Sequence, residues 1–426
     1  MNFFKRIIVI ALGATFLALA YQFGMDVDQQ GGLAPYWESR QKAAEIRSAL
    51  RLISVYYVDG EAVELDGLSE SAIVGMIEEL DPYSEYLDFN RLRQLGEETS
   101  QEFGGIGVQV EMRDEFLTVI APIGGSPGER AGLVRGDRIV GVDGESIEGL
   151  NISKSVAELK GKPGTQVAIL IERSEVDERF EVEVIRELIE VDNVHGAEIL
   201  ESGIGYLRIS QFGKRTGDEM VTAIESLLEQ GMDALMIDLR NNPGGLLDVA
   251  VEVVEKFVPA GQLVVYTKGR HEAMSEEWYA QADGDPYGFP IVVLVNPGSA
   301  SASEIVAAAL KDSGRAQLVG AKTFGKGSVQ SILPLGKNTG LKLTTAKYYT
   351  PGGYVIHENG IEPDVLVEIT TEEEGYLAIQ RNRLSSMPLE EFVERFEFEP
   401  IEDEQMNAAK GLLLEALGKP SNDIGN

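Results

Sequence analysis

The chain contains no cysteine among its 426 residues and only three histidines. The absence of cysteine excludes disulfides, thiol nucleophiles and metal sites with cysteine ligands. The histidines are far apart in the sequence, in polar contexts, and their spacing fits neither a metal site nor a Ser-His-Asp triad; they are His195, His271 and His357. A serine nucleophile in this chain therefore needs a base other than histidine, and we expect no metal or other cofactor.

Positive charge is also scarce: the chain has 37 Lys and Arg residues but 70 Asp and Glu residues, which gives a net charge of −33. Such acidity argues against nucleic acid as a partner, and its simplest explanation is solubility or a salty habitat. The chain has no P-loop, and the GGIG sequence of residues 104–107 opens no helix, so it is not a dinucleotide fingerprint. Hydrophobic residues make up 43% and charged residues 25% of the chain, as in ordinary globular proteins of two or three domains.

The first residues indicate export. Lys5 and Arg6 precede an apolar run over residues 7–20, and residues 18–20 (ALA) fit a signal-peptidase site. Two alternatives stay open for residues 1–24, a signal peptide cleaved after Ala20 or an uncleaved anchor barely long enough to span a bilayer. In both cases we expect an exported protein, either periplasmic or anchored in the inner membrane and facing the periplasm.

Changes of hydrophobic period divide the rest of the chain into four parts. Residues 25–102 predict a helical module without a chemical signature, for which packing, dimerisation or a lid are equal explanations. Residues 103–186 predict short strands and one helix, a small β-rich module. Residues 187–369 alternate buried strands with helices, as in an α/β core. Residues 370–426 form an acidic, helical C-terminal segment.

A serine lies at a strand-to-helix turn of the predicted core. The segment Asn296–Glu304 (NPGSASASE) follows an apolar strand and precedes an alanine-rich helix. Such a turn places side chains at the carboxyl end of the sheet and directs the first helical amides there. Ser301 is therefore a candidate nucleophile, with nearby amides available to stabilise an oxyanion, each worth about 3 kcal/mol. The alternative is structural, because Ser301 and Glu304 have the spacing of a capping box.

A lysine in a glycine-rich segment is the candidate base. Lys326 has a glycine on each side within Lys322–Gln330 (KTFGKGSVQ), so few side chains cover it. A lysine that acts as a base needs its pKa lowered from about 10.4 to about 7–8, equivalent to about 4 kcal/mol of desolvation. A surface loop is the alternative, and Lys322 is a rival base. Gln330 could accept a hydrogen bond from the amine or be a polar turn residue.

A second glycine turn follows another buried strand, in the segment Asp238–Gly245 (DLRNNPGG). Gly244 and Gly245 expose backbone amides beside the first turn of the next helix. They are candidate second donors to an oxyanion hole. A tight strand-to-helix turn would require the same glycines, so a structural role is the alternative.

Together these segments resemble the C-terminal processing (tail-specific) peptidases, a serine-lysine family. The segments Leu80–Tyr86 (LDPYSEY), Thr344–Pro351 (TTAKYYTP) and Gly360–Asp364 (GIEPD) are also similar to the family, and the resemblance covers roughly residues 46–368. It implies an α/β fold with a crotonase- and ClpP-like ββα core, an inserted β-rich PDZ domain and helical N- and C-terminal segments.

The resemblance also implies roles for single residues. Ser301 would be the nucleophile, Lys326 the general base and Gln330 the residue that orients the lysine. The amides of Ala302 and of the Gly244–Gly245 turn would form the oxyanion hole.

Residues 103–186 resemble a PDZ domain, with FGGIG (103–107) where the carboxylate-binding loop belongs and residues 136–144 similar to the PDZ hairpin. A PDZ domain binds a chain end by strand addition, here beside residues 106–110, with the helix 152–160 as the other wall. The resemblance implies protein or peptide substrates with apolar C-termini; an adaptor protein and a homodimer are further candidate partners. The loop residues that would hold the terminal carboxylate are Gly104, Gly105, Ile106 and Gly107.

The sequence thus predicts an exported serine endopeptidase that recognises C-terminal tails through its PDZ domain and cuts by Ser-Lys acyl transfer. One alternative is a PDZ-containing binding or scaffold protein with an inactive peptidase core, against which the intact Ser, Lys and Gln positions argue. The other is a crotonase-like acyl-CoA enzyme, since such oxyanion turns also suit thioesters. The export signal and the PDZ-like module argue against it.

Overall fold

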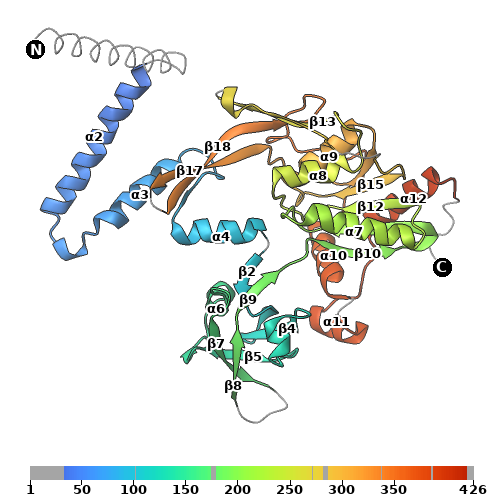
Figure 1. Cartoon of the computed structure of the whole chain (residues 1–426), viewed down its shortest axis with the longest axis horizontal. Helices are drawn as coiled ribbons and strands as arrows, with labels where there is room; N and C mark the ends of the chain where they lie inside the picture. Colours follow the sequence, from blue (N-terminus) through green and yellow to red (C-terminus); the bar gives the residue numbers. More distant parts are fainter. Residues whose placement is uncertain are drawn as a thin grey trace, which may run out of the picture. The chain divides into compact units, whose positions relative to one another are not determined.

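The computed structural model describes residues 33–419, except 101, 174–178, 271, 282–285, 337 and 385–386. The predicted signal peptide or anchor over residues 1–24 lies outside the described residues. No helix in the described part of the chain is long and apolar enough to cross a membrane. The chain, shown in Figure 1, divides into a smaller unit (residues 1–88, 268–275 and 329–346) and a larger one (89–267, 276–328 and 347–426).

The smaller unit begins with the predicted helical module. Helical spacing predicts a helix over residues 37–57, and the structure has α2 (Leu33–Tyr56), followed by η1 (Gly60–Ala62) and α3 (Leu65–Glu78). After α3, the Asp81 carboxylate accepts the amides of Tyr83 and Ser84 in an Asx turn. This turn leads into β1 (Glu85–Leu87), which pairs antiparallel with β18 (Thr339–Tyr349). Most of β17 (Ser328–Gly336) also belongs to this unit.

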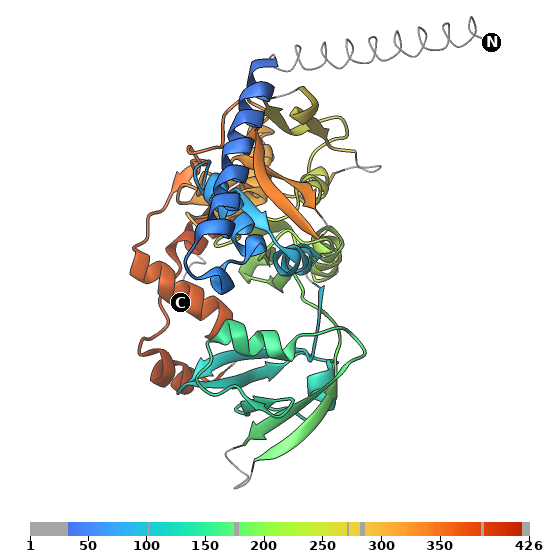
Figure 2. The same ribbon diagram turned by 90° about the vertical axis from the view of Figure 1, so that its left-hand side faces the viewer.

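The β-rich module predicted over residues 103–186 is an antiparallel sheet with the strand order β3-β4-β5-β7-β8, and β6 pairs with β5. Its core combines alternate residues of the strands with Leu159 of the helix α6, and Figure 2 shows α6 against the sheet. The sequence predicts that Asn151 caps the helix over residues 152–160, and the Asn151 side chain accepts the Lys154 amide, which confirms this helix start. The elements are β3 (Val108–Arg113), β4 (Phe116–Pro122), α5 (Pro127–Arg130), β5 (Arg138–Val142), β6 (Glu145–Ser146), α6 (Ile152–Leu159), β7 (Gln166–Glu172) and β8 (Phe180–Ile185).

A two-stranded ribbon lies at the ends of this module. The sequence predicts a third helical stretch over residues 88–102. The structure has α4 (Phe89–Ser100) there, followed by β2 (Glu102–Gly105), which pairs with β9 (Glu187–Glu190). The module is therefore entered and left through paired strands, which bring its two ends together.

The predicted α/β core is built on a six-stranded sheet of order β10-β11-β12-β15-β16-β19. All neighbours pair in parallel except β10 with β11. Every residue of β12 and β15 is buried, as their continuous apolar runs predict for strands covered on both faces. The strands are β10 (Val194–Ile199), β11 (Ile204–Ile209), β12 (Ala234–Asp238), β15 (Ile291–Val295), β16 (Ala316–Gly320) and β19 (Val365–Leu366).

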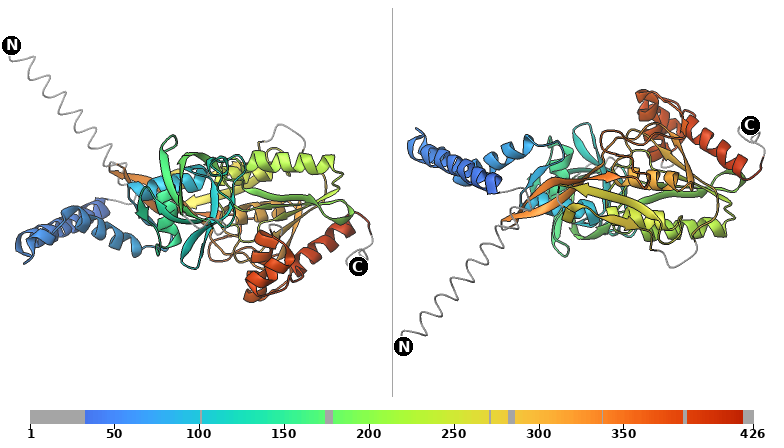
Figure 3. Two further views of the ribbon diagram at one scale, coloured as in Figure 1. Left: turned by 90° about the horizontal axis from the view of Figure 1, so that it is seen from below. Right: turned by 90° about the horizontal axis from the view of Figure 1, so that it is seen from above.

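Helices cover both faces of this sheet. Figure 3 shows α7 and α12 on opposite sides of the strands. Ala409, Leu413 and Leu414 of α12 pack on the face that carries Tyr206 and Met236, while α7, α8 and α9 form the other layer. The helices are α7 (Thr216–Glu229), α8 (Leu247–Glu255), α9 (Ala302–Asp312), α10 (Thr371–Arg383), α11 (Leu389–Phe396) and α12 (Glu404–Ala416). The remaining elements are η2 (Glu201–Gly203), η3 (Glu272–Met274), β13 (Leu263–Gly269) and β14 (Glu277–Tyr279).

Candidate active site

Three neighbouring parallel strands deliver the candidate residues to one edge of the core sheet. β12 leads into the glycine turn, β15 into the serine turn, and β16 into the lysine segment. Asp238 lies opposite Leu294, and Val295 opposite Gly320, so the three carboxyl ends are level. This is the edge at which α/β proteins place their sites.

Ser301 has a strained backbone at the start of α9. Its φ is 56° and its ψ is −113°, a conformation that costs a residue with a side chain about 1–3 kcal/mol. Its hydroxyl faces the amide of Glu304, and the Glu304 side chain accepts the Ser301 amide at 2.9 Å, so the capping box offered as the structural alternative is present. The candidate nucleophile is thus also the N-cap of α9.

The buried carboxylate of Glu304 connects the serine turn to the lysine segment. Its Oε2 accepts the amides of both Ser301 and Lys326, each at 2.9 Å. Its Oε1 accepts the Thr323 hydroxyl at 2.5 Å and the Gly325 amide at 2.8 Å. Burial raises the pKa of Glu304 above its usual value, and the hydrogen bonds from these four donors offset only part of this rise. The sequence predicted only a capping role for Glu304, because a local motif cannot reveal partners 19 to 22 positions away.

The two candidate lysines occupy different environments. Lys322 is exposed, and its ammonium pairs with Glu362 at 2.8 Å, a hydrogen bond that raises the pKa of Lys322. Lys326 is half-buried and its backbone is fixed by Glu304. Beside it, a Cβ on Gly327 would lie 2.1 Å from the His357 amide nitrogen, so the chain can pass there only as glycine. Lys326 is the lysine whose backbone amide shares an acceptor, Glu304 Oε2, with the Ser301 amide.

The glycine turn packs directly against the serine turn. A Cβ on Gly244 would lie 2.8 Å from Ser301 Cβ and 2.9 Å from the Ala302 amide nitrogen. The Gly244 amide, expected as an oxyanion donor, instead donates to Asn242 Oδ1 at 2.9 Å. The neighbouring amides of Gly245 and Ala302 stay candidate oxyanion donors.

Gln330 lies on β17 in the smaller unit. Its Nε2 donates weakly to Thr344 Oγ1 at 3.4 Å, and Thr344 Oγ1 donates to Asp81 Oδ1 at 3.2 Å. Burial raises the pKa of Asp81, but hydrogen bonds led by that from Ser84 hold it below its usual value. The structure thus joins two motifs, LDPYSEY and TTAKYYTP, to Gln330. The approach of Gln330 to Lys326 stays a prediction.

A fully buried ion pair lies just before the glycine turn. Arg240 Nη2 contacts Asp238 Oδ2 at 2.7 Å, and Arg240 Nη1 contacts Asp403 Oδ1 at 2.8 Å, while Asp238 and Arg240 are both 0% exposed. Burial alone would raise the pKa of Asp238, but Arg240 holds it below its usual value. Tyr206 also donates to Asp238, at 3.1 Å. The sequence did not single out this pair, since nothing in it marks a charge as buried.

The predicted carboxylate loop of the PDZ-like module is shorter than expected. Gly104 and Gly105 belong to β2, opposite Leu188 and Glu187, and a Cβ on Gly104 would lie 1.9 Å from the Gly161 carbonyl oxygen. These glycines therefore serve close packing. Ile106 and Gly107, the latter with a φ of 70°, form the loop that enters β3.

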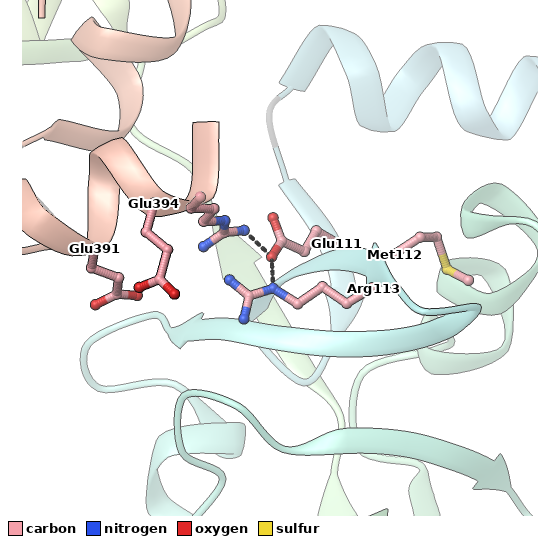
Figure 4. A pocket seen from close by; sticks show the side chains of 6 residues that line it. Glu111, Met112, Arg113, Glu391 and Glu394 are labelled. Carbon is pink, nitrogen blue, oxygen red and sulfur yellow. Dashed lines mark hydrogen bonds and ion pairs between the residues drawn. The ribbon is translucent and has the colours of Figure 1, made fainter. Parts of the chain in front are cut away.

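A charged pocket elsewhere holds no candidate residue of the active site. It lies between β3 and α11, where Arg113 and Arg395 both pair with Glu111 (Figure 4). Glu391 and Glu394 face it from α11. Within the described part of the chain, no His, Asp and Glu cluster has the arrangement of a metal site.

Family models match three stretches of the chain: Peptidase family S41 over residues 203–367, the PDZ domain over 118–173, and the Activating protease CtpB N-terminal domain over 9–90. A carboxy-terminal-processing protease of Bartonella bacilliformis is 41% identical over 305 residues, which are 71% of this chain and 70% of that protein. The chain belongs to peptidase family S41. It is accordingly a C-terminal processing serine protease with a PDZ domain, as the resemblance implied.

Two further proteins are similar to this chain. The carboxy-terminal processing protease CtpA of Bacillus subtilis is 39% identical over 71% of this chain and 65% of its own length. Among solved structures, a photosystem II D1 C-terminal processing protease is 29% identical, with a TM-score of 0.44, over 76% of this chain and 92% of that one. The S41 core, the PDZ insertion and the helical end segments make up a mixed α/β fold, which confirms the predicted fold class.

Proposed function

We propose that this S41 peptidase is an exported endopeptidase that selects proteins by their apolar C-terminal tails and cuts them with Ser301 and Lys326. The observation that carries the proposal is the shared carboxylate oxygen of Glu304, which accepts the amides of both residues at 2.9 Å. A serine and a lysine 25 positions apart in the sequence are thus fixed to one buried atom.

In the acylation step, the neutral Lys326 amine takes the proton of the Ser301 hydroxyl while Oγ bonds to the peptide carbonyl carbon. The amides of Gly245 and Ala302 hold the negative oxygen of the tetrahedral intermediate. The C–N bond then breaks, and the lysine passes its proton to the leaving amine. The products are a free amine and an ester on Ser301.

In the deacylation step, Lys326 takes a proton from water as the water oxygen attacks the ester carbon. Collapse of the second intermediate returns the proton to Ser301 Oγ and releases the acid. Gln330 orients the lysine amine by accepting its hydrogen bond. No step requires a metal or an organic cofactor.

Tail selection is assigned to the free edge of β3. Among the described strands, β3 pairs only with β4, so an extended peptide can add on its other side. Val108 of β3 and Val156 of α6 pack against the apolar core of the module and offer apolar surface to side chains of the tail. The backbone amides of Ile106 and Gly107 are the donors for the terminal carboxylate. The carboxylate loop is thereby reduced from the four residues first expected to these two.

The test is cleavage of one unfolded model protein carrying an apolar C-terminus that is either free or amidated. Wild type should cleave both substrates and cleave the one with the free terminus faster. A short peptide with the same free tail should change the cleavage rate only of the substrate with the free terminus. Ser301→Ala should cleave neither. Equal rates for both termini would remove the PDZ role, and cleavage by Ser301→Ala at the wild-type rate would remove the mechanism.

Export rests on the basic start and the apolar run over residues 7–20. N-terminal sequencing of the protein recovered from fractionated cells tests it. A mature chain that begins at Tyr21 supports the cleaved signal, and an intact chain in the inner-membrane fraction supports the anchor. Recovery of the intact chain in the cytoplasm would contradict both.

A further inference from the structure

One carboxylate of the C-terminal segment contacts both turns of the active site. Glu374, in the first turns of α10, accepts the side-chain amide of Asn241 at 2.9 Å and that of Asn296 at 2.8 Å. Both bonds end on the same oxygen, Oε1. Asn241 precedes the Gly244–Gly245 turn by three residues, and Asn296 precedes Ser301 by five.

The two asparagines also bind each other. The backbone amide of Asn241 donates to Asn296 Oδ1 at 2.8 Å, and the side-chain Nδ2 of Asn296 donates to Asn241 Oδ1 at 3.0 Å. Asn296 Oδ1 accepts the Gly298 amide at 3.0 Å as well. Asn241 has a φ of 58°, a left-handed conformation that costs a residue with a side chain about 1–2 kcal/mol. This pair is one of several links between the turns after β12 and β15, since the Ala300 amide and the Ser303 hydroxyl both donate to the Asn242 carbonyl. It is the link that also uses an acceptor outside the two turns, Glu374.

The position of Glu374 is itself fixed from both sides. Arg381 lies two helical turns further along α10, on the same face, and its guanidinium contacts Glu374 Oε1 at 3.4 Å and Asp403 Oδ2 at 3.5 Å. Asp403 in turn pairs with the buried Arg240, next to Asn241. Alternating charges therefore anchor α10 to the end of β12. The Glu374 side chain is 23% exposed, so it is only partly shielded from solvent.

We propose that Glu374 is a positioning residue for the oxyanion hole. Through Asn241 and Asn296 it sets the distance between the amides of Gly245 and Ala302, which lie on two different turns. This inference rests on the proposed Ser-Lys mechanism, and it gives the C-terminal segment a part in catalysis that its acidic, helical sequence does not suggest.

The test compares Glu374→Ala with Glu374→Gln. Alanine removes the shared acceptor, so the two turns keep their direct bonds but lose the Glu374 brace, and kcat should fall about 10- to 100-fold with KM unchanged. Glutamine retains an oxygen at Oε1, the only atom of Glu374 that the asparagines and Arg381 use, and should restore kcat to within about threefold of wild type. A peptidyl aldehyde, which forms a tetrahedral adduct, should bind Glu374→Ala more weakly by the same factor as the loss of kcat.

The matched control is Glu373→Ala. The Glu373 carboxylate caps α10 by accepting the Thr370 amide at 2.7 Å and does not contact the turns. This variant should lose stability but keep its kcat and its affinity for the aldehyde. An equal loss of kcat in Glu373→Ala and Glu374→Ala would mean that only the stability of α10 matters and would overturn the proposal. So would a wild-type kcat in Glu374→Ala.

Amide hydrogen exchange supplies a readout that needs no activity. Glu374→Ala should speed exchange in peptides covering residues 239–246 and 296–304, whereas Glu374→Gln and Glu373→Ala should not. Unchanged exchange in both peptides would refute the brace. If wild type cleaved nothing, the proposed function would fail, and the exchange data would still decide whether Glu374 holds the two turns.

Discussion

Replacing Arg240 by methionine should destabilise the α/β core strongly, because it leaves a buried carboxylate without its partner. Arg240 and Asp238 are both fully buried, and the arginine also contacts Asp403 and Gln405. Methionine fills a similar volume without charge. The loss therefore falls on Asp238, which sits at the end of β12.

The magnitude follows from the burial of the pair. Removing one partner of a buried ion pair costs about 3–5 kcal/mol, since the other charge stays in a site that solvent cannot reach. The double variant Arg240→Met/Asp238→Asn should recover part of this cost, because it removes the unpaired charge. The exposed pair of Lys322 and Glu362 supplies the control: Lys322→Ala should leave the unfolding midpoint almost unchanged.

The penalty should also depend on pH. In wild type, Arg240 holds the pKa of Asp238 below its unfolded value of about 3.9, so the stabilising contribution is present above about pH 4 and is lost as pH falls through the folded pKa. In Arg240→Met, burial raises the pKa of Asp238, and the protonated form is favoured in the folded state. The destabilisation should therefore be larger at pH 7 than at pH 4.

The assay is urea unfolding at both pH values, with hydrogen exchange of β12 to identify the transition of the core. A cost below about 1 kcal/mol at pH 7 would refute the reasoning, because it would place the pair among exposed ion pairs. A penalty that grew as pH fell would also refute it.

Three further predictions follow from single contacts. Gly245→Ala should abolish activity, because its Cβ would lie 2.2 Å from the Phe212 carbonyl oxygen. The control Gly261→Ala meets nothing within 4 Å and should lower the free energy of unfolding by only about 1–2 kcal/mol, because of its positive φ. Turnover and thermal unfolding of both variants check this. Glu304→Gln places an NH₂ donor against N–H donors and should lower kcat about 100-fold in steady-state assays, so a kcat within threefold of wild type would contradict it. Asp81→Ala removes the acceptor of the Thr344 hydroxyl and should lower kcat without changing the affinity of the PDZ domain for a tail peptide, measured by calorimetry; a wild-type kcat would dismiss the link to Gln330.

The sequence predicted the elements of the fold well where the local pattern decides them. The apolar runs of β12 and β15 and the Asn151 cap of α6 lie where they were expected. The helix expected to reach residue 102 ends at Ser100, because pairing with β9, more than 80 residues away, makes residues 102–105 a strand. Long-range pairing of this kind leaves no local signal.

The same limit applies to the active site. Motifs identified Ser301 and Lys326, but a capping-box pattern concealed that Glu304 binds both segments. The Gly244 amide was expected to be available, and the structure shows it engaged by Asn242. The contacts of Glu374 with two asparagines, 78 and 133 positions away, depend on how α10 docks, which its composition does not encode.

The most direct test of the Ser-Lys mechanism is to trap the acyl-enzyme. The enzyme would be mixed with an activated peptide ester, quenched in acid, digested and mapped by mass spectrometry. The account predicts an acyl group on Ser301 that forms rapidly in wild type and Lys322→Ala, slowly in Lys326→Ala and not at all in Ser301→Ala. An acyl group on another residue, or wild-type acylation in Lys326→Ala, would contradict it.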